Sequence, residues 1–471
     1  MSEILTSPTP ETAPVEPDGR DEDDRAQRAQ QLQQLRQALE DGDREALRAI
    51  FDELHPADVA DLIELLNAEE RKRLARLAGD ALEPEVLAEL EGAPLENLVE
   101  ALPEGVVAEA VGELDTDDAV QLLEELDEEE QRRILARMAR KRREELESSL
   151  AYPEDSAGRL MRRDLVAMPE FWTVGQAIDF LRSLDEDEGP EEFYDIFIVD
   201  PHFRPVGTVP LWRVLRTRRH RALREIMDPD PQLFRVDQDQ EDVAYDFSKY
   251  HLISAGVVDA SGRLVGRITV DDIVDVIGEE AEEDLLALAG VSEADINQPV
   301  GEITRTRFVW LLVNLGTAIL ASTVISLFDA TIEQMVALAV LMPIVASMGG
   351  NAGTQTMTVA VRALATRELS ALNAWRVVRK ELMVSLLNGA LLAVVVGIVT
   401  LLWFHDPMLS AVIAMAMVVN LVVAGLAGIF VPLVLDRLDI DPAVASSVFV
   451  TTVTDVVGFF AFLGLAALIL L

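Results

Sequence analysis

Five long apolar stretches follow Arg305, and they constrain the fold of this chain more than any other feature. A helix of roughly 20 apolar residues can cross a bilayer, and helices are expected because backbone polar groups in lipid must bond within their own segment. The sequence therefore predicts a multidomain membrane protein whose residues 305–471 form a five-helix α-helical transmembrane domain. The predicted spans are residues 308–328, 334–361, 382–404, 408–435 and 442–471.

Basic residues alternate between the connectors of these stretches. The connector 362–380 carries five Lys or Arg residues and 436–441 carries one, whereas 329–333 and 405–406 carry none. Because cytoplasmic loops carry an excess of Lys and Arg, the N-terminal domains are expected in the cytoplasm and the C-terminus outside. Residues 1–25 lack the basic and apolar regions of a signal peptide and are predicted to be a disordered tail.

The net charge is divided unevenly between the two halves. The first 304 residues carry about −42 of the total of −43, and the remainder is close to neutral. A field of that sign repels nucleic acid and attracts cations, so no nucleic-acid partner is expected. Two interpretations of the acidic half stay open: clustered carboxylates that sense a divalent cation, and a solvated acidic surface. The absence of Cys excludes disulfides and thiol catalysis, and without a nucleophile–base pair or phosphate loop the chain is not expected to be an enzyme.

Residues 26–150 are predicted to form an all-α superhelical N domain. Leu and Ala recur at helical spacings of three and four. The pattern from Leu54 to Arg73 recurs sixty positions later from Leu114 to Arg133. Stacked short helices of this kind form superhelical arrays, which commonly bind a partner.

A second repeat lies in residues 151–278, where the pattern changes to mixed strand and helix. The predicted strand 197–199 is followed by Asp200 and then by Gly207. The spacing between Asp200 and Gly207 recurs between Asp259 and Gly266. This segment resembles a tandem pair of α/β cystathionine-β-synthase-type (CBS) domains, over 151–220 and 221–278. The turn from Thr269 to Asp272 resembles the nucleotide-contacting turn of such domains, so ATP is a candidate ligand; the alternative is a structural turn that caps a helix.

An acidic connecting helix is predicted over residues 279–304. Carboxylates that share one face repel one another, and a divalent cation would relieve that repulsion. The alternative is an exposed acidic connector. The acids on this face begin in the preceding segment and are Asp272, Asp275, Glu279, Glu280 and Glu283.

The last apolar stretch carries one carboxylate, Asp455, near its middle. A charge at that depth costs at least about 2.5 kcal/mol unless it faces protein, water or an ion. Ser447, Thr451 and Asp455 fall at helical spacing and form one polar stripe, which predicts either a cation pathway or an Asp bonded to a neighbouring helix. In the second stretch, Asn351 is polar at membrane depth and is a second candidate for the pathway.

The available donors are hard oxygen atoms, which suit Mg²⁺ better than a softer transition metal. Mg²⁺ dehydrates reluctantly and often keeps its waters, so a pore that holds it needs few direct ligands. In a twofold dimer, two copies of Asp455 would face one axis and roughly offset the charge of the ion.

The whole layout resembles the MgtE family of magnesium channels and transporters. The most specific segments are GGNAGTQ at 349–355, RALATREL at 362–369 and DPAVASSVFVTTVTDVVG at 441–458. The resemblance implies a homodimer in the cytoplasmic (inner) membrane of a bacterium, with Asp455 as the pore acid and closure by cytoplasmic Mg²⁺. It implies that an acid of the N domain takes part in closure, and that the regulatory metal ligands are Asp272, Asp275, Glu280, Glu283, Asp284, Glu241 and Asp441.

Magnesium uptake with negative feedback is therefore the function predicted from the sequence. Transport of Co²⁺ or Mn²⁺ and efflux of Mg²⁺ are alternatives within transport. A membrane-tethered nucleotide sensor without conduction is an alternative of another class. Two departures from relatives bear on the site: Ser447 stands where some relatives have Asn, and His251 where a relative has Asp.

Overall fold

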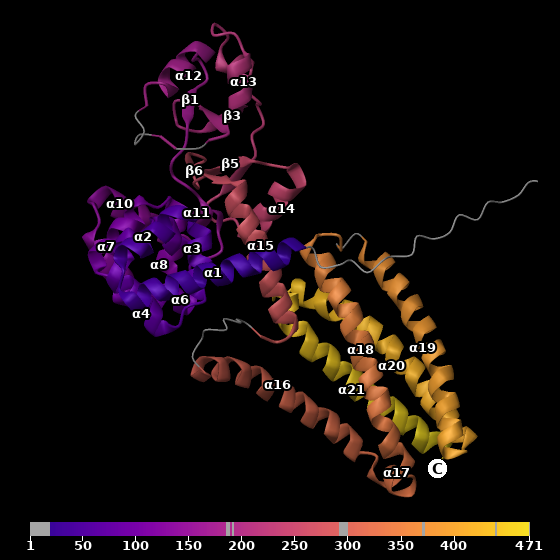
Figure 1. The fold of residues 1–471 in the computed structure, drawn as a ribbon. Coiled ribbons are helices and arrows are strands. Elements are labelled where there is room, and N and C mark those ends of the chain that lie inside the picture. Colours follow the sequence, from indigo (N-terminus) through magenta and orange to yellow (C-terminus); the bar gives the residue numbers. More distant parts are fainter. Residues whose placement is uncertain are drawn as a thin grey trace, which may run out of the picture. The chain divides into compact units, whose positions relative to one another are not determined.

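The computed structural model describes residues 19–184, 189–190, 193–291, 300–369, 373–438 and 440–470. It divides into two compact units, Met1–Ile273 and Val274–Leu471, and each is described by itself (Figure 1). Most of the predicted disordered tail, residues 1–18, lies outside the described residues. The first helix, α1, begins at Gly19, within the segment predicted to be that tail.

Short stacked helices form the N domain, and their ends follow from local capping. Asn67 and Glu70 form a capping box at the start of α4, and Asp127 accepts hydrogen bonds from two backbone amides at the start of α9, sixty positions later. Leu residues between the helices form one continuous apolar core. The helices are α1 (Gly19–Asp41), α2 (Arg44–Glu53), α3 (Pro56–Glu64), α4 (Ala68–Ala78), α5 (Pro84–Ala88), α6 (Gly92–Ala101), α7 (Glu104–Glu113), α8 (Thr116–Glu124), α9 (Glu128–Arg137) and α10 (Arg140–Leu150), with a 3-10 turn at Gly79–Ala81.

Two three-stranded sheets of the same topology follow the N domain. In each sheet the first strand is parallel to the second, and the second is antiparallel to the third. Both have a bulge at equivalent positions, between Ile198 and Val199 and between Val257 and Val258, which supports the predicted repeat. The strands are β1 (Ala167–Pro169), β2 (Asp195–Val199), β3 (Pro205–Pro210), β4 (Leu233–Arg235), β5 (Ser254–Val258) and β6 (Leu264–Thr269).

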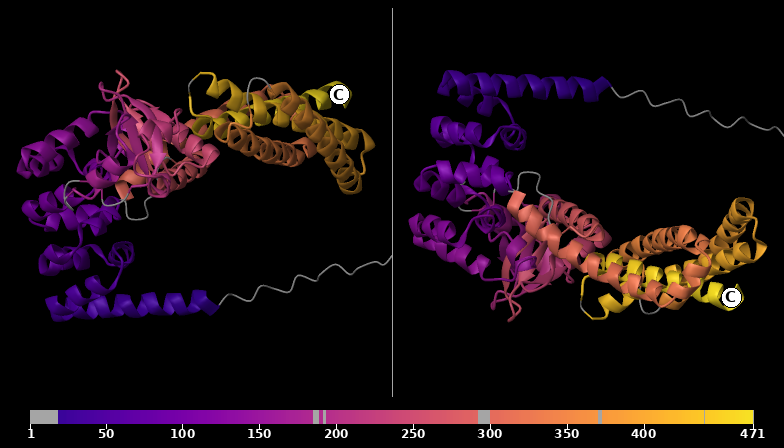
Figure 2. Two further views of the ribbon diagram at one scale, coloured as in Figure 1. Left: turned by 90° about the horizontal axis from the view of Figure 1, so that it is seen from above. Right: turned by 90° about the horizontal axis from the view of Figure 1, so that it is seen from below.

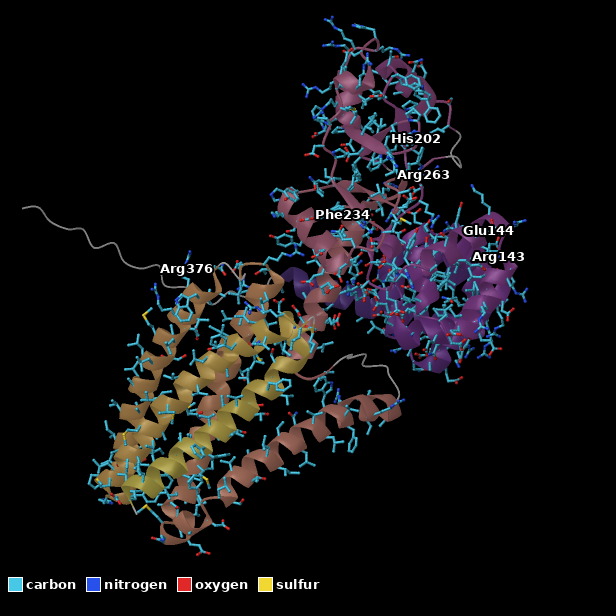
Figure 3. All side chains as sticks on the ribbon, turned by 180° about the vertical axis from the view of Figure 1, so that it is seen from behind. Arg143, Glu144, His202, Phe234, Arg263 and Arg376 are labelled. Carbon is cyan, nitrogen blue, oxygen red and sulfur yellow. The ribbon has the colours of Figure 1, made fainter. Side chains whose placement is uncertain are left out.

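Equivalent parts of the two repeats meet each other. The Oγ of Ser254 donates a hydrogen bond to Asp195 Oδ2 at 2.7 Å, and both residues begin the middle strand of their sheet. The N–H of Leu264 donates to the carbonyl of Phe203 at 2.9 Å, and Figure 3 shows His202 and Arg263 close together at this junction. The helices of this region are α11 (Ala157–Leu160), α12 (Val174–Leu181), α13 (Leu211–Arg216) and α14 (Gln240–Tyr250), with a 3-10 turn at Leu223–Glu225.

Among the described residues of the second unit, five helices are long and apolar enough to cross a membrane. Four of them, α18 to α21, lie side by side (Figures 1 and 2). The predicted connecting helix differs, because α15 already begins at Val270 and ends at Leu288, and residues 292–299 lie outside the described residues. The helices are α15 (Val270–Leu288), α16 (Val300–Ser326), the short α17 (Asp329–Gln334), α18 (Ala337–Ala365), α19 (Ala374–Phe404), α20 (Pro407–Asp436) and α21 (Pro442–Ile469).

Glycines let α18, α20 and α21 approach closely. A Cβ on Gly353 of α18 would lie 2.6 Å from Val450 of α21, and one on Gly428 of α20 would lie 2.8 Å from the carbonyl oxygen of Gly353. Small residues at such contacts are the usual way in which membrane helices pack, since lipid supplies no hydrophobic force between them. Gly353 of α18 therefore lies on a helix-packing face.

Candidate functional site

Helix α21 presents two polar faces with different surroundings. Asp441 caps its start by accepting a hydrogen bond from the Ala443 amide at 2.8 Å, and Pro442 occupies the first turn. The face formed by Ser446, Val450 and Thr454 is buried against neighbouring helices. The adjacent face is the stripe of three polar residues predicted from the sequence, and its members remain partly exposed: Ser447, Thr451 and Asp455.

The Asp455 carboxylate has no hydrogen-bond or ion-pair partner among the described residues of this chain. Its neighbour one turn earlier, Thr451, donates its hydroxyl back to the carbonyl of Ser447 at 2.9 Å. The carboxylate is thus not tied to a neighbouring helix, which was the structural alternative considered for it. A partly exposed, unpaired acid within a spanning helix needs water, an ion or another protein surface beside it.

Asn351 does not join this stripe within one chain. Gly349 and Gly353 form the face of α18 that packs on its neighbours, whereas Asn351 is exposed. At about 100° per residue, Asn351 lies about 200° around the helix from each of these glycines. The amide side chain therefore lies away from the α18 face that meets α21.

A buried amide joins the three central helices. Asn420 of α20 is fully buried, and its Nδ2 donates to the carbonyl of Val345 on α18 at 2.8 Å. A Cβ on Gly349 of α18 would lie 2.1 Å from Nδ2 of this side chain, and one on Gly458 of α21 would lie 2.8 Å from it. Its Oδ1 has no partner among the described residues. In the sequence, Asn420 is an amide within the fourth apolar stretch, and nothing there indicates this three-helix contact.

Sequence reasoning also missed an acid that joins two other helices. Glu381 of α19 accepts a hydrogen bond from the Thr356 hydroxyl of α18 at 2.7 Å. The signal available was an isolated acid directly before the third apolar stretch, together with the polar residues of the second stretch that could bond it.

Two predicted regulatory acids lie near each other in the second unit. Burial and the nearby carboxylate of Asp441 raise the pKa of Asp284 on α15. The following residues of α15, Ala287 and Leu288, belong to an apolar cluster with residues of α18 and α21. The end of α15 is thereby held beside the start of α21, with two like charges at the contact.

Asp272 lies in a carboxylate cluster of the first unit. It accepts hydrogen bonds from its own turn, from the N–H and Oγ1 of Thr269 at 3.1 and 2.7 Å. It also accepts from Arg162 Nη2 at 2.8 Å. With both oxygens of Asp272 engaged, the turn from Thr269 acts as a helix cap.

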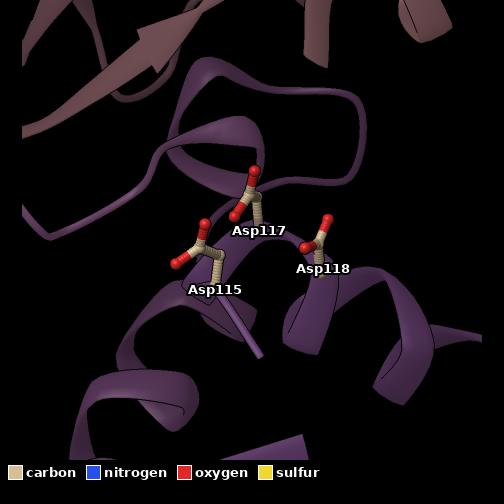
Figure 4. Close-up of side chains that lie close together, drawn as sticks. All are labelled: Asp115, Asp117 and Asp118. Carbon is tan, nitrogen blue, oxygen red and sulfur yellow. The ribbon is translucent and has the colours of Figure 1, made fainter. Parts of the chain in front are cut away.

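The N domain contributes three acids to the same cluster. Asp115, Asp117 and Asp118 lie at the start of α8, as Figure 4 shows, and ligand atoms from all three come within 4.8 Å of one another. Burial, and then the carboxylate of Asp272, raises the pKa of Asp117; burial likewise raises the pKa of Asp118 to about 6. Asp117 is thus an N-domain acid beside Asp272, which the sequence alone did not locate.

The remaining predicted ligands are on helix surfaces. Asp275 and Glu283 are exposed on α15, Glu280 is partly exposed, and Glu241 is exposed in the first turn of α14. Among the described residues, the group of acids compact enough to hold a metal ion is the one at the start of α8, and it does not include these four.

A cavity of about 700 Å³ lies between the two CBS repeats. Aromatic residues line it, including Tyr194 and Trp212, together with Arg213 and His251. Burial raises the pKa of Asp195, which also lines the cavity, against the lowering effect of its bond from Ser254. Its volume lies within the range of small-molecule sites.

Comparison with known proteins gives the family. A family model described as a divalent cation transporter, MgtE, matches residues 342–465; the MgtE intracellular N domain matches 54–155, and a CBS domain matches 223–279. The magnesium transporter MgtE of Thermus thermophilus is 34% identical over 440 residues, which are 92% of this chain and 97% of the relative. The Bacillus subtilis magnesium transporter MgtE is 30% identical over 431 residues, 91% and 95% of the two chains.

One solved structure is similar to about half of the chain. The crystal structure of the cytosolic domain of the Mg²⁺ channel MgtE in complex with ATP is 34% identical, covers 52% of this chain and 99% of that one, and aligns with a TM-score of 0.48. The sequence matches to curated relatives, which extend over nearly their whole length, establish that this chain belongs to the MgtE family of magnesium transporters.

Proposed function

We propose that the chain is a Mg²⁺-selective, channel-like transporter that admits magnesium across the cytoplasmic membrane of a bacterium. The observation that carries this proposal is the unpaired Asp455 on a partly exposed polar stripe of a spanning helix. Magnesium transport by the relatives from Thermus thermophilus and Bacillus subtilis supports the choice of ion.

The pore is proposed to form between two copies of the chain. Two α21 helices that face a twofold axis place two Asp455 carboxylates opposite each other, with Thr451 and Ser447 one and two turns nearer the cytoplasm. Two carboxylates offset the charge of one Mg²⁺, and the waters that the ion retains can bond the hydroxyls. In this arrangement the polar stripe faces the ion path and not lipid.

Closure by cytoplasmic Mg²⁺ is proposed to act through the acids of α15 and the start of α21. Without an ion, the neighbouring carboxylates of Asp284 and Asp441 repel each other, and this repulsion adds to the effect of burial in raising the pKa of Asp284. A divalent ion that bridges them favours the state in which they are close, and only such a difference in affinity shifts a conformational equilibrium. Asp275, Glu280, Glu283 and Glu241 are proposed to add ligands once two chains are assembled.

Adenine nucleotide binding is a second candidate activity, favoured by the cavity between the CBS repeats. Tyr194 and Trp212 offer faces on which a base can stack, and Arg213 offers a cation for phosphate. This cavity replaces the turn at Thr269 as the proposed site, because that turn is engaged in bonds to Asp272. Titration of the purified wild-type chain and of its Trp212→Ala variant with ATP tests the assignment, because the variant should bind ATP more weakly.

Flux into liposomes that contain the purified protein tests the transport proposal. Asp455→Asn is expected to abolish Mg²⁺ uptake with the assembly intact, and Glu333→Gln is a matched control because it neutralises an exposed acid outside the five spans. Normal flux through the Asp455 variant refutes the pore assignment. Competition by Co²⁺ and Mn²⁺, and flux measured in both directions, distinguish the other transport functions.

A further inference from the structure

Arg162 lies where two domains of the first unit bring four carboxylates together. Its Nη1 donates to Asp115 at 2.8 Å and its Nε to Asp117 at 2.9 Å, both on the N domain. Its Nη2 donates to Asp271 at 3.0 Å and to Asp272 at 2.8 Å, both at the start of α15. One guanidinium therefore bonds to acids from both sides of the contact.

The backbone fixes Arg162 to the second CBS repeat. Its N–H donates to the carbonyl of Arg267 at 2.8 Å, and the N–H of Arg267 donates back at 2.9 Å. Gly266 allows this approach, because a Cβ there would lie 2.7 Å from the carbonyl oxygen of Arg162. The guanidinium thus starts from a backbone bridge to β6 of the second CBS repeat and reaches across to the N domain.

The N-domain acids are also held in place by a second cation. Arg142 of α10 donates to the carbonyl of Leu114 and, at 3.1 Å, to the hydroxyl of Thr116. These bonds hold the residues on both sides of Asp115, at the turn that presents the acids to Arg162.

The cluster needs a cation whether or not magnesium is present. Ligand atoms of Asp115, Asp117 and Asp118 lie within 4.8 Å of one another, and the Arg162 side chain beside them is only 17% exposed, so water screens little of the repulsion between the carboxylates. A guanidinium has a fixed fork of donors that matches several carboxylates at once, and it stays charged at every physiological pH. A divalent ion could supply the same charge, but its occupancy would depend on concentration.

We propose that Arg162 is a tethered cation that takes the place of a divalent ion at this contact. It holds the N domain against the second CBS repeat at any magnesium concentration. Regulation by Mg²⁺, which rests on the function proposed above, then acts through the acids of α15 beyond Asp272 and through Asp441. Asp272 is accordingly an acceptor for Arg162 in this chain and not a required magnesium ligand.

Distances between two spin labels test this proposal in the full-length protein. The chain has no Cys, so Glu109→Cys in the N domain and Ala260→Cys in the second CBS repeat, both exposed, provide unique labelling sites. The wild-type distance distribution is expected to be narrow and the same in EDTA and in millimolar Mg²⁺. A broad distribution in EDTA that Mg²⁺ narrows would overturn the proposal, and this result needs no Arg162 variant.

The Arg162→Ala variant should show a broad, longer distribution in EDTA that Mg²⁺ returns to the wild-type one, because the freed carboxylates then need an ion. Arg162→Lys keeps the positive charge but loses the planar set of N–H donors, so its distance distribution in EDTA should be intermediate between those of the wild type and Arg162→Ala. The matched control is Arg219→Ala, which removes the ion pair with Asp179 within the first CBS repeat and should leave the distance distribution unchanged. An Arg162→Ala distribution identical to that of the wild type in EDTA would refute the tether.

Flux measured on the same preparations separates the two proposals. Label distances that follow these expectations in a protein that conducts no Mg²⁺ would refute the transport function and leave the tether standing. Conducting protein whose N domain separates in EDTA would refute the tether and leave transport intact.

Discussion

Replacing Gly349 by Ala tests how tightly the three central helices meet. A Cβ at this position would lie 2.1 Å from Nδ2 of Asn420, which is fully buried and already bonded to the carbonyl of Val345. The amide cannot stay where it is, so the hydrogen bond breaks and the buried groups are left unpaired. The adjacent Gly350 provides a matched control, because a Cβ there meets nothing within 4 Å.

The two substitutions should have opposite effects. An unpaired buried group costs about 1–3 kcal/mol, and forcing an extra methyl into a packed site costs about another 1–3 kcal/mol. Ala is favoured over Gly within a helix by about 1 kcal/mol, which acts on both variants. We therefore expect Gly349→Ala to lower the free energy of unfolding by about 1–5 kcal/mol and Gly350→Ala to raise it by up to about 1 kcal/mol.

Thermal unfolding of the detergent-solubilised protein, followed by size-exclusion chromatography, measures the difference. A double-mutant cycle adds a sharper requirement: most of the cost of Gly349→Ala should disappear in an Asn420→Ala background, where the methyl has room. Equal shifts of the unfolding temperature for Gly349→Ala and Gly350→Ala would refute the packing argument. So would an unchanged cost of Gly349→Ala when Asn420 is absent.

Three further perturbations follow from single contacts. Burial raises the pKa of Asp195, so between the pKa values of the unfolded and folded chain the folded chain holds a proton that the unfolded chain has lost. The free energy of unfolding therefore falls as pH rises through that range. Asp195→Asn should raise the unfolding temperature relative to wild type more at neutral pH than near pH ~4. Thr356→Val should lower the unfolding temperature because Glu381 loses its donor, whereas Thr358→Val, whose hydroxyl bonds only its own helix, should not. Asp441→Asn keeps a helix cap but removes one of two neighbouring carboxylates, so the rise in unfolding temperature on adding Mg²⁺ should shrink; an undiminished rise would contradict the bridging role.

Periodic patterns predicted the elements well where the contacts are local. The sixty-residue repeat in the N domain appears as two equivalent helix pairs, α3–α4 and α8–α9, with polar caps at the starts of α4 and α9. The spans were also found, but helix ends differ. Helix α19 begins at Ala374, well before the apolar stretch at 382, because the helix also includes charged residues such as Arg376 (Figure 3).

Contacts between segments far apart in sequence were not predictable in the same way. Asp272 was singled out, yet its partner Arg162 was not, because 110 positions separate them and only the folded chain brings them together. The signals available were weak: two successive arginines at the entry to the CBS region and an acidic run from Asp115 to Asp118 at a helix start. The orientation of Asn351 was not predictable for a different reason: composition places a residue in a span but does not orient it around the helix, and a role for Asn351 in the ion path stays a prediction.

The surroundings of α16 and α18 have a consequence for how the membrane part is made. Most of α16 is exposed and strongly apolar, so it can enter lipid on its own as the chain emerges. Helix α18 is the least apolar of the five candidate spans and carries Pro343 in its interior, so alone it would partition poorly. Its glycine face is covered only once α20 and α21 have been synthesised, more than forty residues later. Biogenesis of this protein should therefore stall with α18 only partly inserted until the last two helices arrive, and truncation before α20 should leave α18 accessible from the aqueous side.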